Sequence, residues 1–195
     1  MYASAAKYGK VFSPHQNRRW DDDYLSVKKV YDDGEIGKVY RIESRVMGSN
    51  GIPGAWRKIK SQGGGMMPDW GVHLIDQMLQ MIDEPVVGVY CDYSYIEGAE
   101  VEDGFDLEVR FESGLIYRIV DTNSFIELPR WQVYGTDGTA TVTNWRRDNV
   151  EGRVVRCVIR DDDKLKGVNA GNGFTKTMAA RRSETVSDKP IDIVR

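Results

Sequence analysis

The sequence predicts an α+β fold in which helices pack on one face of an open, mostly antiparallel β-sheet. Three observations support this prediction. Two amphipathic helical stretches lie before residue 83, a series of strand-like segments follows, and the short turns Ser113-Gly114 and Thr136-Asp137-Gly138 join neighbouring segments. Successive strands joined by short turns pair antiparallel. Helices grouped apart from such strands are typical of the α+β class.

Composition is that of a globular protein and excludes two other classes. The chain has 195 residues, of which 41% are apolar and 29% charged, and its 27 basic and 30 acidic side chains give a net charge of −3. A nucleic-acid-binding domain is typically basic, and a membrane helix needs roughly 18 consecutive apolar residues. The sequence shows neither pattern. We therefore expect no nucleic-acid partner and no membrane association.

The cysteines and histidines indicate the redox compartment and the metal chemistry. Cys91 and Cys157 lie in apolar, strand-like segments, which favours buried free thiols over a disulfide bridge. With no signal-peptide pattern at the start, this predicts a cytoplasmic location. Two histidines without a Cys/His cluster predict no metal site.

Two helices are predicted near the start of the chain. Residues 1–9 form the last turns of a helix ending at Gly9, and residues 10–14 form a short strand. A chain that opens on the tail of a helix leads us to expect its beginning elsewhere. Residues 21–33 form the clearest helix, because aromatic and apolar side chains repeat there at helical spacing. Those side chains are Trp20, Tyr24, Val27 and Tyr31.

Strands and one further helix fill the rest of the chain. Residues 37–47 alternate as a strand, residues 48–68 form a long glycine-rich loop, and residues 69–82 form an amphipathic helix. Later strands are predicted over residues 86–96, 105–112, 115–122, 131–135, 139–145 and 154–160. From residue 161 the sequence is polar without apolar periodicity, which predicts an extended arm.

One sheet face is expected to lack helices. Four apolar or aromatic side chains are assigned to it from the strand alternation. They are Tyr117, Ile119, Trp131 and Val133. An uncovered apolar face usually marks a contact with another subunit. The sequence therefore predicts a homo-oligomer that associates through this face.

The helix predicted over residues 69–82 carries the main candidate site. Gly63, Gly64 and Gly65 precede it and would let a ligand approach the backbone. Asp69 and His73 stand four residues apart and so share one helix face, which suits proton transfer to a bound alcohol or carbonyl. Asp76, Gln77 and Gln80 complete the polar arc. The alternative is a solvated face with Asp69 as an N-cap. An arc without lysine, arginine or glutamate, on a helix that is otherwise apolar and so buried on most sides, favours a cleft.

Three arginines and a tryptophan could contribute to the same site. Arg18 and Arg19 follow a predicted strand, and Trp56 and Arg57 lie in the long loop. The planar guanidinium of arginine suits anionic or hydroxylated ligand groups. Plain surface charge for Arg18 and Arg19, and a structural anchor for Trp56 and Arg57, remain open alternatives.

These residues resemble a known family. The segments that carry the resemblance are Gln16-Asn17-Arg18-Arg19-Trp20-Asp21, Gly37-Lys38-Val39, Pro53-Gly54-Ala55-Trp56-Arg57, Gly63 through Asp76, Leu128-Pro129-Arg130-Trp131 and Gly135-Thr136-Asp137-Gly138-Thr139. In this order and spacing they are similar to the second domain of the glucose–fructose oxidoreductase/inositol dehydrogenase family (Gfo/Idh/MocA). The resemblance covers about residues 10–180.

The resemblance implies an activity and a set of roles. Such enzymes bind NAD or NADP in an N-terminal Rossmann domain, and they transfer hydride to or from a sugar or polyol in a substrate domain. His73 would then be the general acid/base, and Asp69 would orient its imidazole. Asn17, Arg18, Trp56, Arg57 and Asp76 would contact substrate.

The sequence departs from the family in one large way, since it contains neither the Gly-x-Gly-x-x-Gly turn nor the Glu-Lys-Pro motif of the Rossmann domain. We therefore expect a substrate and oligomerisation domain over residues 10–160. Residues 1–9 would be the tail of a Rossmann-domain helix, and residues 161–195 an arm. The isolated chain is then expected to be inactive and to bind no nicotinamide cofactor tightly. The alternative is a non-catalytic binding or dimerisation module that uses the open sheet face.

Overall fold

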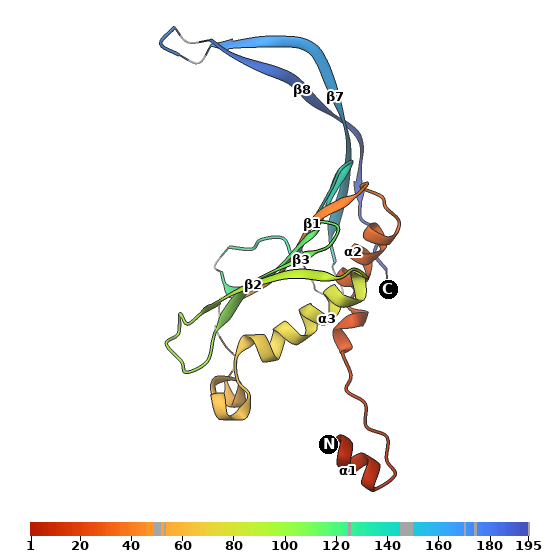
Figure 1. Cartoon of the computed structure of the whole chain (residues 1–195), viewed down its shortest axis with the longest axis vertical. Coiled ribbons are helices and arrows are strands. Elements are labelled where there is room, and N and C mark those ends of the chain that lie inside the picture. The colour runs from red at the N-terminus through yellow and green to blue at the C-terminus, as the bar shows by residue number, and fades with distance from the viewer. Residues whose placement is uncertain are drawn as a thin grey trace.

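The structure, a computed structural model, describes residues 1–48, 52, 54–124, 126–144, 150–169, 171–173 and 175–194 (Figure 1). The strands are β1 (Val39–Gly48), β2 (Val86–Ser94), β3 (Gly104–Phe111), β4 (Ile116–Asn123), β5 (Trp131–Gly135), β6 (Gly138–Val142), β7 (Gly152–Asn169) and β8 (Thr175–Pro190). They form one sheet in the order β2-β3-β4-β1-β5-β6-β7-β8. All neighbours pair antiparallel except β1 and β4, which are parallel. The predicted α+β fold with an open, mostly antiparallel sheet is confirmed.

Three α-helices and four short turns complete the described part of the chain. The helices are α1 (Tyr2–Lys7), α2 (Asp22–Asp32) and α3 (Val72–Met81), and the turns are η1 (Asn17–Trp20), η2 (Ala55–Lys58), η3 (Lys60–Gln62) and the π-helical η4 (Met67–Gly71). The aspartates at the start of α2 face the positive end of the helix dipole. Gly34, just after α2, has a φ of +62°, which glycine adopts without strain.

The core lies between the sheet and helices α2 and α3, which lie on one side of the sheet (Figure 1). Tyr24 and Val27 come from α2, and Leu74 and Met78 come from α3; all four are almost completely buried. The sheet contributes alternate residues of its central strands, including Ile42. This packing of one sheet face against helices is what the α+β prediction requires.

The prediction of an uncovered apolar sheet face is wrong. The four residues assigned to it, Tyr117, Ile119, Trp131 and Val133, are fully buried beneath the helices. The opposite face is charged, since Glu43 lies beside Arg118 and Gln132 in neighbouring strands and pairs with Arg45. Strand alternation separates two faces correctly but does not say which one the helices cover.

Two predictions for the helices also fail. Trp20 lies in η1, before α2, and is 65% exposed. The buried stripe of α2 instead includes Val30. Helix α3 is not buried on most sides, because Val72 and Leu79 are 42% and 54% exposed. Its polar arc lies between the buried stripe and this exposed apolar side.

The strand predicted over residues 10–14 is not formed, although the helix before it is present as α1. The segment has no neighbouring strand to bond with, and Pro14 has no N–H to donate. The strand predicted to end at Trp145 ends at Val142, and Trp145 itself lies outside the described residues.

The C-terminal segment forms regular strands. β7 continues to Asn169 and pairs with β8, and Figure 1 shows this hairpin extending away from the rest of the sheet. After β8 the chain returns to the core, where Ile191 is buried and the Val194 N–H donates to Ser26 Oγ on α2.

The long glycine-rich loop is held by the loop between β2 and β3. Glu97 accepts from the Ile52 N–H at 2.8 Å, Glu100 from the Lys60 N–H at 2.8 Å and Glu102 from the Met67 N–H at 3.1 Å. Residues 49–51 and 53, including the Pro53 that forms part of the family resemblance, lie outside the described residues. The described part of the loop is thus fixed immediately before η4 and α3.

Candidate functional site

The segment from Gln16 to Arg19 lies along the polar face of α3 and is bonded to it at three places. Gln16 Oε1 is 2.8 Å from His73 Nδ1. The Gln77 amide donates to the Arg18 carbonyl at 2.7 Å. Arg19 forms a bidentate pair with Asp76, with nitrogen–oxygen distances of 2.7 and 2.6 Å. Segments more than fifty residues apart in sequence therefore form one polar group.

Asp69 belongs to η4, the π-helical turn that leads into α3, and is not an N-cap. Its carboxylate accepts from Arg57 Nε at 2.7 Å, and the Arg57 guanidinium lies 4.7 Å from the centre of the Trp56 ring. A Cβ on Gly64 would come within 2.5 Å of the Arg57 carbonyl oxygen. The glycine therefore lets the loop approach closely enough to place Arg57 on Asp69.

Arg18 lies over an aromatic ring of the same site. Its guanidinium is 4.6 Å from the centre of the Trp70 ring, and Nη1 donates to Asp21 at 3.2 Å. The Trp70 ring meets the His73 imidazole edge-on at 6.3 Å between centroids. Arg18, Trp70 and His73 thus form one contiguous surface.

The environment favours a neutral His73. Burial lowers the pKa of its imidazole and the nearby positive charge of Arg18 lowers it further, whereas Asp69, Asp21 and Asp76 act in the opposite direction. Because the pKa lies below the ordinary 6.5, the ring is neutral at pH 7. A neutral imidazole can accept a proton from a hydroxyl group.

A buried charged group lies between α3 and the sheet and contacts Gln77 of the site. Arg130, immediately before β5, donates to Ser44 Oγ at 2.6 Å and to Gln77 Oε1 at 3.4 Å. Its Nε lies 3.2 Å from Asp23 Oδ2, which also accepts from Trp131 Nε1 at 2.7 Å. Asp23, Gln77 and Arg130 are almost completely buried. The arginine therefore connects α2, α3 and the sheet.

The structure brings most of the sequence-predicted site residues together. His73, Arg18 and Asp76 lie along α3 and η1, and Asp69, Arg57 and Trp56 lie around η4. Asn17 is exposed in η1 and takes no part in these contacts. The hydrogen-bond partner of His73 Nδ1 is Gln16 Oε1, while Asp69 pairs with Arg57. The expected orienting role of Asp69 thus has no direct bond to support it.

Sequence reasoning missed several residues of this group. Gln16 stands only among the segments that carry the family resemblance, and Asp23 lies in the predicted helix over residues 21–33 without a site role. Arg130 and Asp121 received no role. Asp121 on β4 is 5% exposed, and burial together with Asp69 raises the pKa of its carboxyl group to about 7. Asp121 follows the buried Tyr117 and Ile119 at the strand period of two, and an acid on that core face was the available signal.

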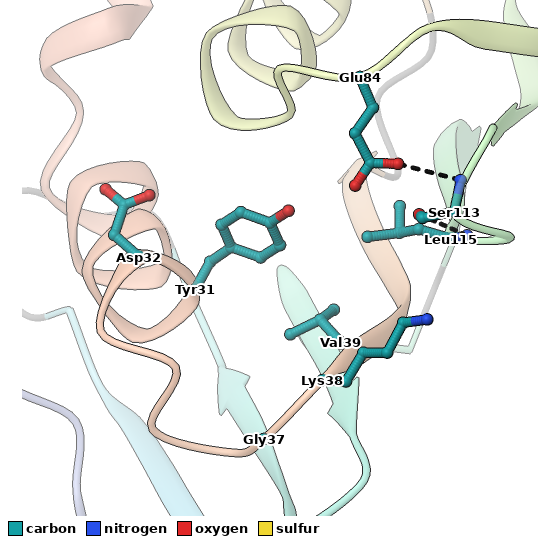
Figure 2. A pocket seen from close by; sticks show the side chains of 8 residues that line it. All are labelled: Tyr31, Asp32, Gly37, Lys38, Val39, Glu84, Ser113 and Leu115. Atoms are coloured by element: carbon teal, nitrogen blue, oxygen red, sulfur yellow. Dashed lines mark hydrogen bonds between the residues drawn. The ribbon is translucent and has the colours of Figure 1, made fainter.

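A separate hollow of about 420 Å³ lies beyond the C-terminal end of α3 (Figure 2). Tyr31, Lys38 and Glu84 line it, and burial and the Glu84 carboxylate raise the pKa of Tyr31. Glu84 accepts from the Ser113 N–H at 3.1 Å. The hollow contains none of the predicted site residues, so it is distinct from the group around His73.

The described residues contain no metal-ligand cluster and no helix that could span a membrane. Within them, no group of three or more histidine, cysteine, aspartate or glutamate side chains could hold a metal ion. None of the helices in this part of the chain has the length and apolar character needed to cross a membrane. Cys91 and Cys157 are free and half-buried.

Comparison with known proteins gives consistent matches. The family model of the GFO/IDH/MocA C-terminal domain matches residues 24–141. The scyllo-inositol 2-dehydrogenase (NADP(+)) IolW of Bacillus subtilis is 28% identical over 140 residues, which are 70% of this chain and 38% of that protein. The D-glucoside 3-dehydrogenase of Escherichia coli is 28% identical over 89 residues, which are 45% of this chain and 25% of that protein.

A solved structure extends the match to almost the whole chain. The NAD-binding protein from Listeria innocua is 40% identical, with a TM-score of 0.78 over 99% of this chain and 55% of that chain. The chain thus spans about half of this structure and about two fifths of the inositol dehydrogenase.

Proposed function

Because the chain belongs to the GFO/IDH/MocA family and corresponds to its C-terminal domain, we propose that it is the substrate-binding and catalytic domain of an NAD(P)-dependent oxidoreductase. The reaction is hydride transfer at a CH–OH carbon of a sugar or polyol. The names of the relatives support this substrate class, since they include a dehydrogenase of scyllo-inositol and one of D-glucosides.

One observation carries the proposal: the neutral imidazole of His73 is oriented by Gln16 within a group that also contains Arg18 and Asp76. In the oxidation direction His73 accepts the proton of the reacting hydroxyl, and in the reduction direction it returns the proton. The nicotinamide supplies the hydride acceptor or donor. Asp69, which Arg57 holds in place, contributes the negative charge that favours the imidazolium when it forms.

Substrate recognition is assigned to the residues around His73. Arg18 and Arg57 lie against the Trp70 and Trp56 rings, which orients their guanidinium groups for sugar hydroxyls. Trp56 adds an aromatic surface. Asp76, which Arg19 holds in place, adds a hydrogen-bond acceptor. Asn17 adds an exposed amide group. The nucleotide is assigned to a Rossmann domain, because the donor groups of this site suit hydroxyls and the sequence has no Gly-x-Gly-x-x-Gly turn.

A titration of the chain with polyols tests the proposal. We expect myo-inositol, scyllo-inositol or glucose to perturb the NMR signals of His73 and of the Trp56 and Trp70 indoles in a saturable manner. His73→Ala should weaken this binding, and NADH should not bind tightly. When the chain is joined to a cofactor domain, His73→Ala should lower turnover by about 10²–10⁴-fold. Unchanged turnover in that variant would remove His73 from the mechanism.

The competing function is a non-catalytic dimerisation module. It predicts a tight dimer with no response of His73 to any polyol. Saturable micromolar binding of NADH would contradict both functions, because it would place a nucleotide site within this chain.

Association of copies through the open sheet face is also part of the proposal. Glu43 and Arg45 alternate in charge along β1, and Arg118 on β4 lies opposite Glu43, so two such faces related by a twofold axis could pair opposite charges. The dimer should then dissociate as salt rises in light-scattering measurements. A cytoplasmic location is proposed from the free cysteines.

A further inference from the structure

We propose that Gln16 is a positioning residue that holds the proton of the neutral His73 ring on Nδ1, so that Nε2 is the atom that exchanges a proton with substrate. The first half of this inference concerns this chain alone. The second half rests on the function proposed above.

The hydrogen bond between Gln16 and His73 determines which ring nitrogen of His73 carries the proton. Gln16 Oε1 lies 2.8 Å from His73 Nδ1. An amide oxygen accepts and cannot donate, so the proton of this bond must sit on Nδ1. A neutral imidazole carries one ring proton, which leaves Nε2 with a free lone pair. Gln16 therefore selects one of two tautomers.

The neighbouring contacts hold Gln16 in place. The two residues after Asn17 are both bound to α3, through the Arg18 carbonyl to Gln77 and through the Arg19 guanidinium to Asp76. The Gln77 amide is itself oriented by the buried Arg130. Because a guanidinium can only donate hydrogen bonds, Oε1 of Gln77 must face Arg130. Nε2 of Gln77 must then face Arg18. This chain of contacts keeps the start of η1 in register with His73.

A neutral residue at position 16 has a chemical consequence. The charged groups that act on His73 are Arg18 from η1, Asp69 from η4, Asp76 from α3 and Asp21 from the start of α2. A glutamate in place of Gln16 would add a negative charge at Nδ1 and favour the imidazolium form. Glutamine fixes the ring orientation and leaves the imidazole able to accept a proton at neutral pH.

Long-range ¹H–¹⁵N NMR of the whole chain tests this inference directly. The chain has two histidines, so its spectrum contains one further imidazole, that of the exposed His15, which is assigned separately from His73. At pH 8 we expect the His73 spectrum to show mainly the Nδ1–H form. Gln16→Leu should remove that preference, and Gln16→Glu should keep it while raising the pKa of His73 by about one unit or more.

The matched control is Gln80→Leu, which replaces an exposed glutamine on α3, the helix that carries His73. It should leave the tautomer of His73 unchanged. A wild-type spectrum dominated by Nε2–H would overturn the inference, as would an unchanged tautomer in Gln16→Leu. If the tautomer is as expected but polyols do not bind, the proposed function fails and the role of Gln16 in setting the tautomer stands.

Discussion

Burial shifts the pKa values of His73 and Asp121 in opposite directions, and in both cases it favours the neutral form. Burial lowers the pKa of His73 below its ordinary value and raises the pKa of Asp121 to about 7. Asp121 Oδ2 is buried and has no hydrogen-bond partner among the described residues. Such groups make the stability of the fold depend on pH.

Asp121→Asn should remove a pH dependence of stability. A carboxyl group whose pKa is raised in the folded state stabilises the fold below the unfolded pKa of about 3.9, and that contribution is lost as pH rises toward 7. The difference in unfolding free energy between variant and wild type should grow by up to roughly 4 kcal/mol between pH 4 and pH 8. Urea unfolding at both pH values measures it.

The control for this experiment is Asp92→Asn, an exposed aspartate on β2. Its unfolding free energy should follow the pH dependence of the wild type. Parallel pH profiles for Asp121→Asn and the wild type would mean that Asp121 is ionised in the folded state across this range.

Only part of the candidate site could be predicted from the sequence. The spacing of four residues that places Asp69 and His73 on one helix face is a local pattern, so this proximity could be predicted from the sequence. The partners of His73 and Gln77 could not be predicted, because Gln16 and Arg130 reach α3 from segments more than fifty residues away in sequence. A long-range pairing leaves no periodic trace in the sequence.

At the scale of elements, buried charge joins helix α2 to the sheet. Asp23 on α2 contacts Arg130 and Trp131 of the β5 segment, and Arg130 also lies 4.4 Å from the centre of the Trp131 ring. Removing one member of a buried ion pair leaves the other charge uncompensated.

Arg130→Met should therefore destabilise the protein by about 3–5 kcal/mol. Asp23→Asn in the same chain should restore part of the loss, because the amide oxygen can still accept from Trp131 while no charge remains buried. Arg110→Met, which breaks the exposed pair with Glu108, should cost about 1 kcal/mol or less. Equal losses for Arg130→Met and Arg110→Met in chemical denaturation would contradict the structural role of Arg130.

Elements with local signals could be predicted, and those that depend on tertiary partners could not. The hairpins β3–β4 and β5–β6 follow their turn residues. The parallel pairing of β1 with β4 has no local signal, and neither does the choice of covered face. The strand expected over residues 10–14 failed because strand propensity without a neighbouring strand forms no ladder.

At the scale of the whole molecule, a packed body carries a two-stranded extension. β6 pairs with β7 only as far as Arg156, and from Cys157 to Asn169 the described partner of β7 is β8. A two-stranded ribbon is at best marginally stable by itself. The body should therefore hold most of the unfolding free energy.

Replacing residues 160–182 by Asn-Gly tests this division. Ile159 and Ser183 are paired, so a two-residue turn can join them. The unfolding free energy of the body should change by less than about 1 kcal/mol. In contrast, Val154→Ala, which truncates a fully buried side chain of β7, should cost more than about 1 kcal/mol. A loss of several kcal/mol on shortening the hairpin would show that it supports the body.

The position of β1 in the sheet has a consequence for synthesis of the chain. Arg41 of β1 pairs with Ile116 on one side and Tyr134 on the other, so the central strand is made long before either neighbour. At about 5–20 residues per second on the ribosome, its backbone donors and acceptors stay unpaired for several seconds. Pairings of such sequence separation also close slowly. During that interval the strand at the centre of the finished sheet has two open edges, and nascent chains are most prone to pair with one another there.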